Sequence, residues 1–356
     1  MTGGSTLLGS TRTVRAPLAG VAAIAVVSLI LLSALLALGG YDVAAALAAL
    51  WRGSFGSSYA FFSATLVRAT PLLLAGLAVA IAFRAGVWNI GAEGQLLAGA
   101  TAAIAGAALP LPGALRLTVA LLLALVAGAA WALPAALLRR RGVLEVISTI
   151  MLNFIALNLV GYLVRGPLQE PTHAYPQSPT IDAAARLPRV AGTRLHLGVG
   201  LALVAAIALG IVIRRSAWGF RVRAIGANPR AAASAGMIDV PRVALQVFLA
   251  SGALAGLAGG IEVTGVTFAL YEGLSPGYGY TAIAVALLAR LDPMLVVPSA
   301  LLFGALEAGA TAMQRDAGVP SAFVTVVEGS LVLLVLLLPL LTRRYDTWAS
   351  RARSGA

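Results

Sequence analysis

Polar side chains in or beside long apolar segments are the residues of this sequence that could do chemistry. The first group, Asn89, Glu93 and Gln95, stands at the start of an apolar stretch. The others lie further along the chain, at Glu145, Asn153, Asn158, Glu262, Glu307 and Glu328. A charged side chain at the centre of a membrane costs roughly 3 kcal/mol unless it faces a cavity or a partner. These residues could therefore bind a solute, form a proton relay, or hydrogen-bond across helices.

An enzyme is the weakest interpretation of these residues. The chain has no cysteine, which excludes thiolate catalysis and cysteine-ligated metals. Its two histidines, His173 and His196, fall in one polar segment, where we expect solvated side chains rather than a metal site. The chain also has no lysine, which excludes a P-loop. We therefore expect no catalytic residue, metal or cofactor in this chain. If the protein works on ATP energy, ATP and Mg²⁺ must be used by another chain.

Composition indicates a membrane protein. Of the 356 residues, 60% are hydrophobic and 11% are charged, whereas about a quarter of the residues in a soluble domain are charged. The formal net charge of +12 does not indicate a nucleic-acid partner, because the arginines lie in short segments between apolar runs. We expect an all-α polytopic protein of the lipid bilayer.

Long apolar runs recur along the chain, and the longer ones can each cross a hydrocarbon core about 30 Å thick. The first run, 18–38, is too long for the apolar part of a signal peptide. We predict about ten transmembrane helices, at 18–38, 60–83, 89–109, 117–138, 143–164, 197–213, 243–264, 277–291, 294–313 and 320–341. The segment 277–291 is short, and the sequence leaves open whether it crosses fully.

The distribution of arginine predicts the orientation of these helices. With the N-terminus in the cytoplasm, seventeen arginines fall in cytoplasmic segments and seven in outside segments. The positive-inside rule therefore places both tails, 1–17 and 342–356, in the cytoplasm. The membrane domain between them, 18–341, carries a proline-rich outside loop at 165–196 and a cytoplasmic loop at 214–242.

The cytoplasmic loop holds six arginines and one acid, and its centre has the signals of a short helix. Asn228 is a good N-cap, Pro229 suits the first helical position, and Gly236 can end the helix. A helix of about two turns is too short to be stable alone in water. Either a partner protein holds it or the loop rests on lipid headgroups, and these residues leave both readings open.

Two glycine-rich polar stretches interrupt the apolar pattern at corresponding places. The first, 84–95, follows the span 60–83, and the second, 271–280, follows the span 243–264. In the predicted topology they lie on opposite membrane faces. This is the pattern of an inverted repeat, in which interrupted helices line a substrate path. The glycines could equally serve only to let helices pack closely.

Four segments resemble ABC-importer permeases for nucleosides and simple sugars, and they follow one another in the order of that family. They are RAGVWNIGAEGQ (84–95), VISTIMLNFIALNLVGYLVRGPLQ (146–169), GANPRAAASAGM (226–237) and EGLSPGYGYTAIAVALLARLDP (272–293). The resemblance is strongest to the nucleoside-type transmembrane subunit. Trp88 stands where phenylalanine is common in the family, which is a conservative change between aromatic side chains.

The resemblance implies several partners in a bacterial cytoplasmic membrane. Two permease subunits, different chains in this family, would form the translocation path at their interface. Separate ABC ATPase subunits would bind ATP, and an extracytoplasmic lipoprotein would deliver the nucleoside or sugar. The ATPases would act through the helix of the cytoplasmic loop, at Gly226, Asn228, Pro229, Ala232, Ala233 and Gly236.

Candidates for the substrate path come from the family's segments and from the second irregular stretch. They are Trp88, Asn89, Glu93, Gln95, Asn153, Tyr271, Ser275 and Tyr278. Their polar groups could bond ribose hydroxyls, and their aromatic rings could stack on a base. Anchoring at the membrane interface is, however, the commoner role of Trp and Tyr at the ends of spans.

Two other functions stay open on the residues alone. An ion-coupled secondary transporter of a small polar solute could use Glu93 or Glu262 as its coupling site. A purely structural subunit would have no substrate path. The short helix of the cytoplasmic loop favours the ABC permease, because an ion-driven carrier needs no surface on which an ATPase docks.

Overall fold

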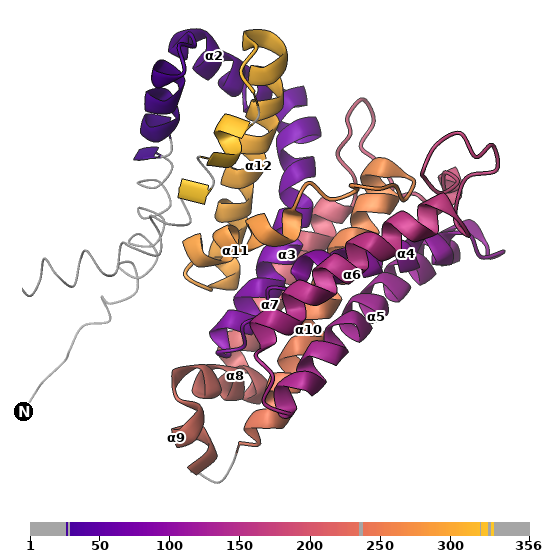
Figure 1. Ribbon diagram of the computed structural model, residues 1–356, viewed down its shortest axis with the longest axis vertical. Helices are drawn as coiled ribbons and strands as arrows, with labels where there is room; N and C mark the ends of the chain where they lie inside the picture. The colour runs from indigo at the N-terminus through magenta and orange to yellow at the C-terminus, as the bar shows by residue number, and fades with distance from the viewer. Residues whose placement is uncertain (1–25, 28, 235–237, 321, 327–328, 331–356) are drawn as a thin grey trace, which may run out of the picture.

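The computed structural model describes residues 26–27, 29–234, 238–320, 322–326 and 329–330, which form a helical bundle (Figure 1). Apart from two isolated bridges, these residues contain no β-structure. The elements are α2 (Val43–Ser54), the π-helix η1 (Ala60–Thr65), α3 (Leu66–Arg84), α4 (Ala92–Ala107), α5 (Gly113–Arg140), α6 (Glu145–Arg165), the 3₁₀ turn η2 (Ala183–Ala185), α7 (Gly198–Arg215), α8 (Ala217–Ala227), α9 (Pro229–Ser234), α10 (Val240–Glu262), the π-helix η3 (Val263–Thr267), α11 (Tyr278–Leu288) and α12 (Pro293–Ala317). The predicted all-α class is confirmed.

Six helices of the described chain are long and apolar enough to cross a membrane. They are Ala60–Arg84, Gly113–Arg140, Glu145–Arg165, Gly198–Arg215, Val240–Thr267 and Pro293–Ala317. Each coincides with a span predicted from the sequence, because an uninterrupted apolar run of this length has helix as its natural conformation in lipid. The chain is a multi-pass membrane protein.

The structure does not support the count of ten spans. The segment 89–109 forms α4, a helix of 16 residues, and 277–291 forms α11, a helix of 11 residues. Most of α4 is buried among other helices, so its ends need not reach both surfaces of a membrane. Large parts of the predicted spans 18–38 and 320–341 lie outside the described residues.

The centre of the bundle is α10, which packs against α3, α4 and α5. Glycines allow this close packing. A Cβ atom built on Gly256 would lie 2.2 Å from the carbonyl oxygen of Ala124 on α5, and one on Gly99 of α4 would lie 2.2 Å from the carbonyl oxygen of Gly256. Small residues let the backbones of membrane helices approach closely and gain dispersion contacts. These contacts matter because lipid supplies no hydrophobic driving force between helices.

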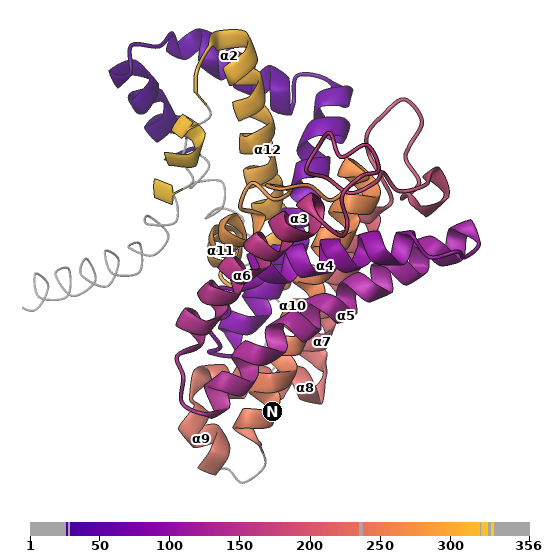
Figure 2. The ribbon, with the colours of Figure 1, turned by 45° about the vertical axis from the view of Figure 1, so that its right-hand side comes forward.

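The bundle has two distinct ends. The helices α8 and α9 lie together at one of them, here called the α9 end (Figures 1 and 2). The segment 166–197 and both π-helices lie toward the opposite end, here called the Arg194 end. The backbone N–H of Arg194 donates to the Ser63 hydroxyl of η1 at 3.0 Å, which fixes this segment on the bundle.

Candidate functional site

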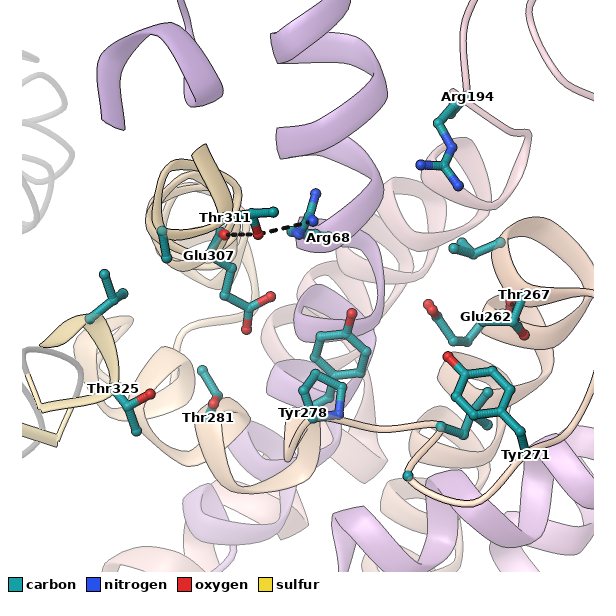
Figure 3. A pocket seen from close by; sticks show the side chains of 16 residues that line it. Arg68, Arg194, Glu262, Thr267, Tyr271, Tyr278, Thr281, Glu307, Thr311 and Thr325 are labelled. Carbon is teal, nitrogen blue, oxygen red and sulfur yellow. Dashed lines mark hydrogen bonds between the residues drawn. The ribbon is translucent and has the colours of Figure 1, made fainter. Parts of the chain in front are cut away.

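A cavity of about 750 Å³ lies between α3, α11, α12 and the end of α10 (Figure 3). Charged, hydroxyl and phenol side chains are prominent in its wall, namely Arg68, Arg194, Glu262, Thr267, Tyr271, Tyr278, Thr281, Glu307, Thr311 and Thr325. Binding sites for small molecules have volumes of roughly 300–1,000 Å³. The cavity is therefore large enough for a small polar solute.

Two of the charged residues stand next to π-helical turns. Arg68 lies in the first turn of α3, directly after η1, and Glu262 is the last residue of α10, directly before η3. A π turn changes the register of the side chains on either side of it, and such turns are frequent at functional sites. The two π turns thus help to direct Arg68 and Glu262 into the same cavity.

Tyr278 joins the two sides of the cavity. Its hydroxyl lies between the carboxylates of Glu262 and Glu307 in Figure 3, and it interacts electrostatically with both. The Arg68 guanidinium donates to the Thr311 hydroxyl at 3.3 Å and interacts electrostatically with Glu262. The cavity therefore combines both signs of charge with phenol and hydroxyl groups, which suits a solute with several hydrogen-bonding groups.

The loop before α11 presents the two tyrosines of the cavity. The Ser275 hydroxyl accepts hydrogen bonds from the backbone N–H groups of Gly277 at 3.2 Å and Tyr278 at 3.0 Å. Gly277 has a φ of 101°, a backbone conformation that residues with a side chain rarely adopt. This turn fixes the direction of the chain between Tyr271 and Tyr278, so Ser275 acts on the cavity through its neighbours.

The segment 166–197 braces the wall that carries Thr267 and Tyr271. Its backbone N–H groups at Ser178, Ile181 and Leu187 donate to carbonyl oxygens at 264–270, over 2.7–2.9 Å. The guanidinium groups of Arg186 and Arg189 lie 4.3 Å and 4.5 Å from the centre of the Phe268 ring, as cation–π contacts. This predicted outside loop is therefore an ordered part of the cavity wall.

The prediction that both histidines are solvated is wrong for His196. His173 is exposed, but His196 is 2% exposed, and neither of its ring nitrogens has a hydrogen-bond partner in the described chain. Its ring fills the space left by Gly198 and Gly265. Burial, with a smaller contribution from the positive charge of Arg189, lowers the pKa of His196 to about 4. The sequence missed this because a histidine in a polar segment gives no local sign of burial.

The first group of predicted path residues forms a buried network that is not part of the cavity wall. The Asn89 amide donates to Gln95 Oε1 at 3.1 Å and to the Ser251 hydroxyl at 2.9 Å. Ser251 in turn donates to the carbonyl oxygen of Ala78 at 2.7 Å. Side chains of α4 and α10 are thereby joined to the backbone of α3. Such bonds satisfy polar groups that would be costly to leave unpaired in the membrane.

Asn153 and Glu93 connect further helices. Asn153 of α6 accepts from the N–H of Gly94 at 2.8 Å and donates to the carbonyl oxygen of Ile90 at 2.9 Å and to the Tyr280 hydroxyl at 3.3 Å. The Glu93 carboxylate accepts from the N–H of Gly279 at 2.7 Å. These side chains therefore hold α4, α6 and α11 together where the two predicted irregular stretches meet.

Of the eight predicted path residues, the structure brings two, Tyr271 and Tyr278, into the cavity wall. Ser275 shapes the adjoining turn, and Asn89, Glu93, Gln95 and Asn153 form the contacts between helices. Trp88 is 54% exposed and packs on Phe83, with ring centres 4.8 Å apart. The eight residues thus occupy four different places in the fold.

The sequence reasoning did not single out Arg68, Arg194, Thr267 and Thr311 as wall residues. Arg68 could have been found, because a charged side chain near the start of an apolar span marks either a membrane surface or an internal polar site. Glu307 was recognised only as an acid within a span, and Glu262 also as a possible coupling site of an ion-driven carrier. Within the described ranges, no group of three His, Asp or Glu side chains is placed to hold a metal ion.

The predicted loop helix exists as α9, of six residues. The Asn228 side chain accepts from the N–H of Ala231 at 3.0 Å, which is the expected N-cap, and Pro229 is the first helical residue. Ala232 is 7% exposed and packs among α8 and α10 residues, whereas Ala233 is exposed. Gly236 lies outside the described residues.

Gly226 lies where α8, the helix before α9, contacts the end of α3. A Cβ atom on Gly226 would lie 1.9 Å from the carbonyl oxygen of Arg84, so α8 touches the end of α3 at this glycine. The side chain of Arg84 donates to the carbonyl oxygen of Leu291 at 2.9 Å, and Arg214 forms an ion pair with Asp292 at 2.8 Å. The ends of α3 and α7, which adjoin α8, are thus connected to the turn that joins α11 to α12.

Comparisons with known proteins agree with this architecture. Residues 61–338 match the family described as branched-chain amino acid transport system / permease component. The chain is 41% identical to a guanosine ABC transporter permease protein of Bacillus subtilis, over 83% of this chain and 86% of that protein. It is 38% identical to a glucose ABC transporter permease protein of Haloferax volcanii, over 82% and 79% of the two chains.

A third relative is named for nucleosides in general. A nucleoside ABC transporter permease protein of Lactococcus lactis subsp. cremoris is 31% identical, over 76% of this chain and 78% of that protein. The family match covers the six apolar helices, the cavity and α9. The chain therefore belongs to the branched-chain amino acid transport system / permease component family.

Proposed function

We propose that this chain is the translocation subunit of an ATP-driven importer for nucleosides or related simple sugars. The observation that carries the proposal is the 750 Å³ cavity, in which two arginines, two glutamates and two tyrosines converge inside a multi-pass membrane protein. Charged side chains inside membrane-spanning helices, as at Glu262 and Glu307, are rare and mark solute paths. The chain would be non-catalytic and would move its solute by alternating access.

The relatives narrow the substrate class. One named for guanosine and one named for glucose are 41% and 38% identical to this chain. Both names denote uncharged solutes rich in hydroxyl groups, which match the mixed charges and hydroxyls of the wall. Tyr271 and Tyr278 add aromatic faces on which a base could stack, a contact worth about 1–3 kcal/mol in other proteins. We therefore place nucleosides first and simple sugars second.

The energy would enter at the α9 end. Because the chain has no lysine and hence no P-loop, ATP and Mg²⁺ would be bound by separate ATPase subunits. The capped helix α9 protrudes on α8, with Ala231, Ala233 and Ser234 exposed. This exposed face would seat in a cleft of the ATPase. The contacts of Arg84 and Arg214 with the α11–α12 turn would then carry the movement toward the cavity.

In the proposed topology, about ten segments cross a bacterial cytoplasmic membrane. Both termini and the α9 end lie in the cytoplasm. The two halves would be related as an inverted repeat. The contact between the first turns of α4 and α11, at Glu93 and Gly279, supports this repeat. Interrupted helices whose N-termini meet inside the membrane are typical of such repeats.

Two further partners complete the proposed assembly. A second permease chain would close the translocation path at an interface with this subunit. An extracytoplasmic lipoprotein would deliver the solute at the Arg194 end, where the segment 166–197 is held on the cavity wall. Neighbouring genes that encode an ABC ATPase, a second permease and a lipoprotein would supply the components for reconstitution.

The test is uptake by the reconstituted complex. This chain, the ATPase, the second permease and the lipoprotein are incorporated into liposomes, and entry of labelled guanosine and glucose is followed with and without internal or external ATP and with a proton uncoupler. ATP-dependent uptake that an uncoupler leaves unchanged supports the proposal. Uptake without ATP that an uncoupler abolishes would instead establish an ion-coupled carrier, with Glu262 as the first residue to examine.

A further inference from the structure

Glu262 has a carboxylate that the described chain leaves without a hydrogen-bond partner. The residue is 5% exposed, and its side chain lines the cavity (Figure 3). Among described residues no side chain or backbone group forms a hydrogen bond or ion pair with its carboxylate, and only its backbone oxygen accepts a bond, from Thr267. Glu93, which is buried to the same degree, accepts from the N–H of Gly279. The acceptor oxygens of Glu262 are therefore available to a ligand.

The described chain supplies no hydrogen-bond donor to the largely buried Glu262 carboxylate, so water or a solute in the cavity must supply its donors. Arg68 reduces this penalty electrostatically but does not form a hydrogen bond with Glu262. A solute that brings two adjacent donors would occupy both carboxylate oxygens. The gain would be largest when the donors are spaced as in a bidentate pair.

The charges of the wall restrict the solute further. Two basic side chains, Arg68 and Arg194, and two acidic side chains, Glu262 and Glu307, line the wall. A phosphate group would meet two carboxylates, and a cation would meet two guanidinium groups. The balanced cavity therefore favours a solute without net charge, so nucleosides and sugars fit it and nucleotides do not.

We propose that Glu262 is the specificity-determining residue of this cavity, and that its carboxylate accepts hydrogen bonds from two adjacent donors on an uncharged solute. This inference rests on the proposed function and deepens it. The donors are either the vicinal hydroxyls of a ribose or hexose, or the adjacent N–H groups of a guanine base. The hydroxyls of Tyr271 and Tyr278, which lie beside Glu262 in Figure 3, position the solute against it.

The experiment compares the wild-type complex with Glu262→Gln in liposomes that contain all partner subunits. Three probes are used: guanosine, 2′,3′-dideoxyguanosine without the diol, and inosine without the 2-amino group. Gln keeps the shape but loses one acceptor, and we expect guanosine uptake to fall about 10-fold or more, as for the loss of a hydrogen bond to a charged group. The binding protein is the same in every assay, so its own selectivity cancels between variant and wild type.

The analogue that the substitution spares identifies the donor pair. If Glu262 binds the ribose diol, Glu262→Gln slows the uptake of guanosine and inosine. The uptake of dideoxyguanosine, which is already slower, then stays unchanged. If Glu262 binds the guanine base, the substitution slows the uptake of guanosine and dideoxyguanosine but leaves the uptake of inosine unchanged. Either result supports the proposal. Equal uptake of every probe by variant and wild type overturns it, and so does an equal loss for all three, which would show a structural role.

Glu272→Gln is the matched control. Glu272 lies in the loop between η3 and α11, outside the cavity wall, where it pairs with Arg165. Its substitution should change uptake of no probe selectively, and the amount of each variant in the membrane is measured alongside. A wild-type complex that carries neither guanosine nor glucose would overturn the proposed function together with this inference. Wild-type uptake with an unchanged probe ratio in Glu262→Gln would overturn the inference alone.

Discussion

The N–H of Gly279, in the first turn of α11, donates a 2.7 Å hydrogen bond to the Glu93 carboxylate, in the first turn of α4. A Cβ atom on Gly279 would lie 2.2 Å from the backbone nitrogen of Glu93, so the two helices begin in direct contact. A negative charge at two helix N-termini is stabilised by both helix dipoles. Glu93 is thereby explained as a group that joins the first turns of the two short helices α4 and α11.

This relationship predicts a difference between two substitutions of Glu93. Glu93→Ala leaves the buried N–H of Gly279 without an acceptor and should destabilise the protein by about 1–3 kcal/mol. Glu93→Gln keeps an acceptor oxygen and should cost less. Thermal unfolding of the purified complex in detergent measures both. Wild-type stability of Glu93→Ala would contradict the assigned role.

The glycine contacts of α10 predict a second effect on stability. Gly256→Ala would place its Cβ atom 2.2 Å from the carbonyl oxygen of Ala124, and neither backbone can move without separating α5 from α10. We expect a loss of about 1–3 kcal/mol, as for other overpacked sites. Gly161→Ala on α6 is the control, since its Cβ atom would find nothing closer than 3.6 Å. The control should be neutral or stabilising, because alanine favours helix over glycine.

The exposure of α9 predicts which of its residues act in coupling. Ala233→Glu places a charge on the exposed face and should abolish ATP-driven uptake and co-purification of the ATPase, without lowering the amount of protein in the membrane. Ala232→Glu buries the charge among residues of α8 and α10, so it should destabilise the loop itself. Full uptake and full ATPase binding by Ala233→Glu would show that α9 is not the docking helix.

The burial of His196 predicts a dependence of stability on pH. The pKa of its ring falls from 6.5 to about 4 in the folded chain, so the unfolded chain takes up the proton first. Stability should therefore be constant above pH 6.5 and decrease by about 3 kcal/mol as the pH falls from 6.5 to 4. Unfolding temperatures recorded across this range measure the effect.

Two variants isolate the contribution of this ring. His196→Leu cannot take up a proton and loses no hydrogen bond, since the ring nitrogens have none in the described chain. It should remove the decrease between pH 6.5 and 4. His173→Asn, at an exposed position with a φ of 53° that asparagine tolerates, should keep the decrease. If wild type and His196→Leu lose stability in parallel, another group is responsible.

The sequence by itself determined the features that depend on neighbouring residues. The length of an apolar run decides whether a segment can cross a membrane, and the six runs predicted for α3, α5, α6, α7, α10 and α12 form long helices. The helix α9 is likewise local, because Asn228 and Pro229 supply its start. The resemblance in four short segments identified the family for a similar reason, since each segment keeps its own pattern.

Only the tertiary structure decided which polar residues share a space. Asn89 and Glu262 look alike in the sequence, as polar groups beside glycines, yet Asn89 is bonded to Gln95 and Ser251 while Glu262 faces a cavity. Arg68 and Glu262 are almost two hundred positions apart and meet through the packing of α3 against α10. Apolar periodicity cannot reveal such meetings, because buried apolar residues predominate all around α3 and α10. The partner of each polar group is set by which helix faces it across the bundle.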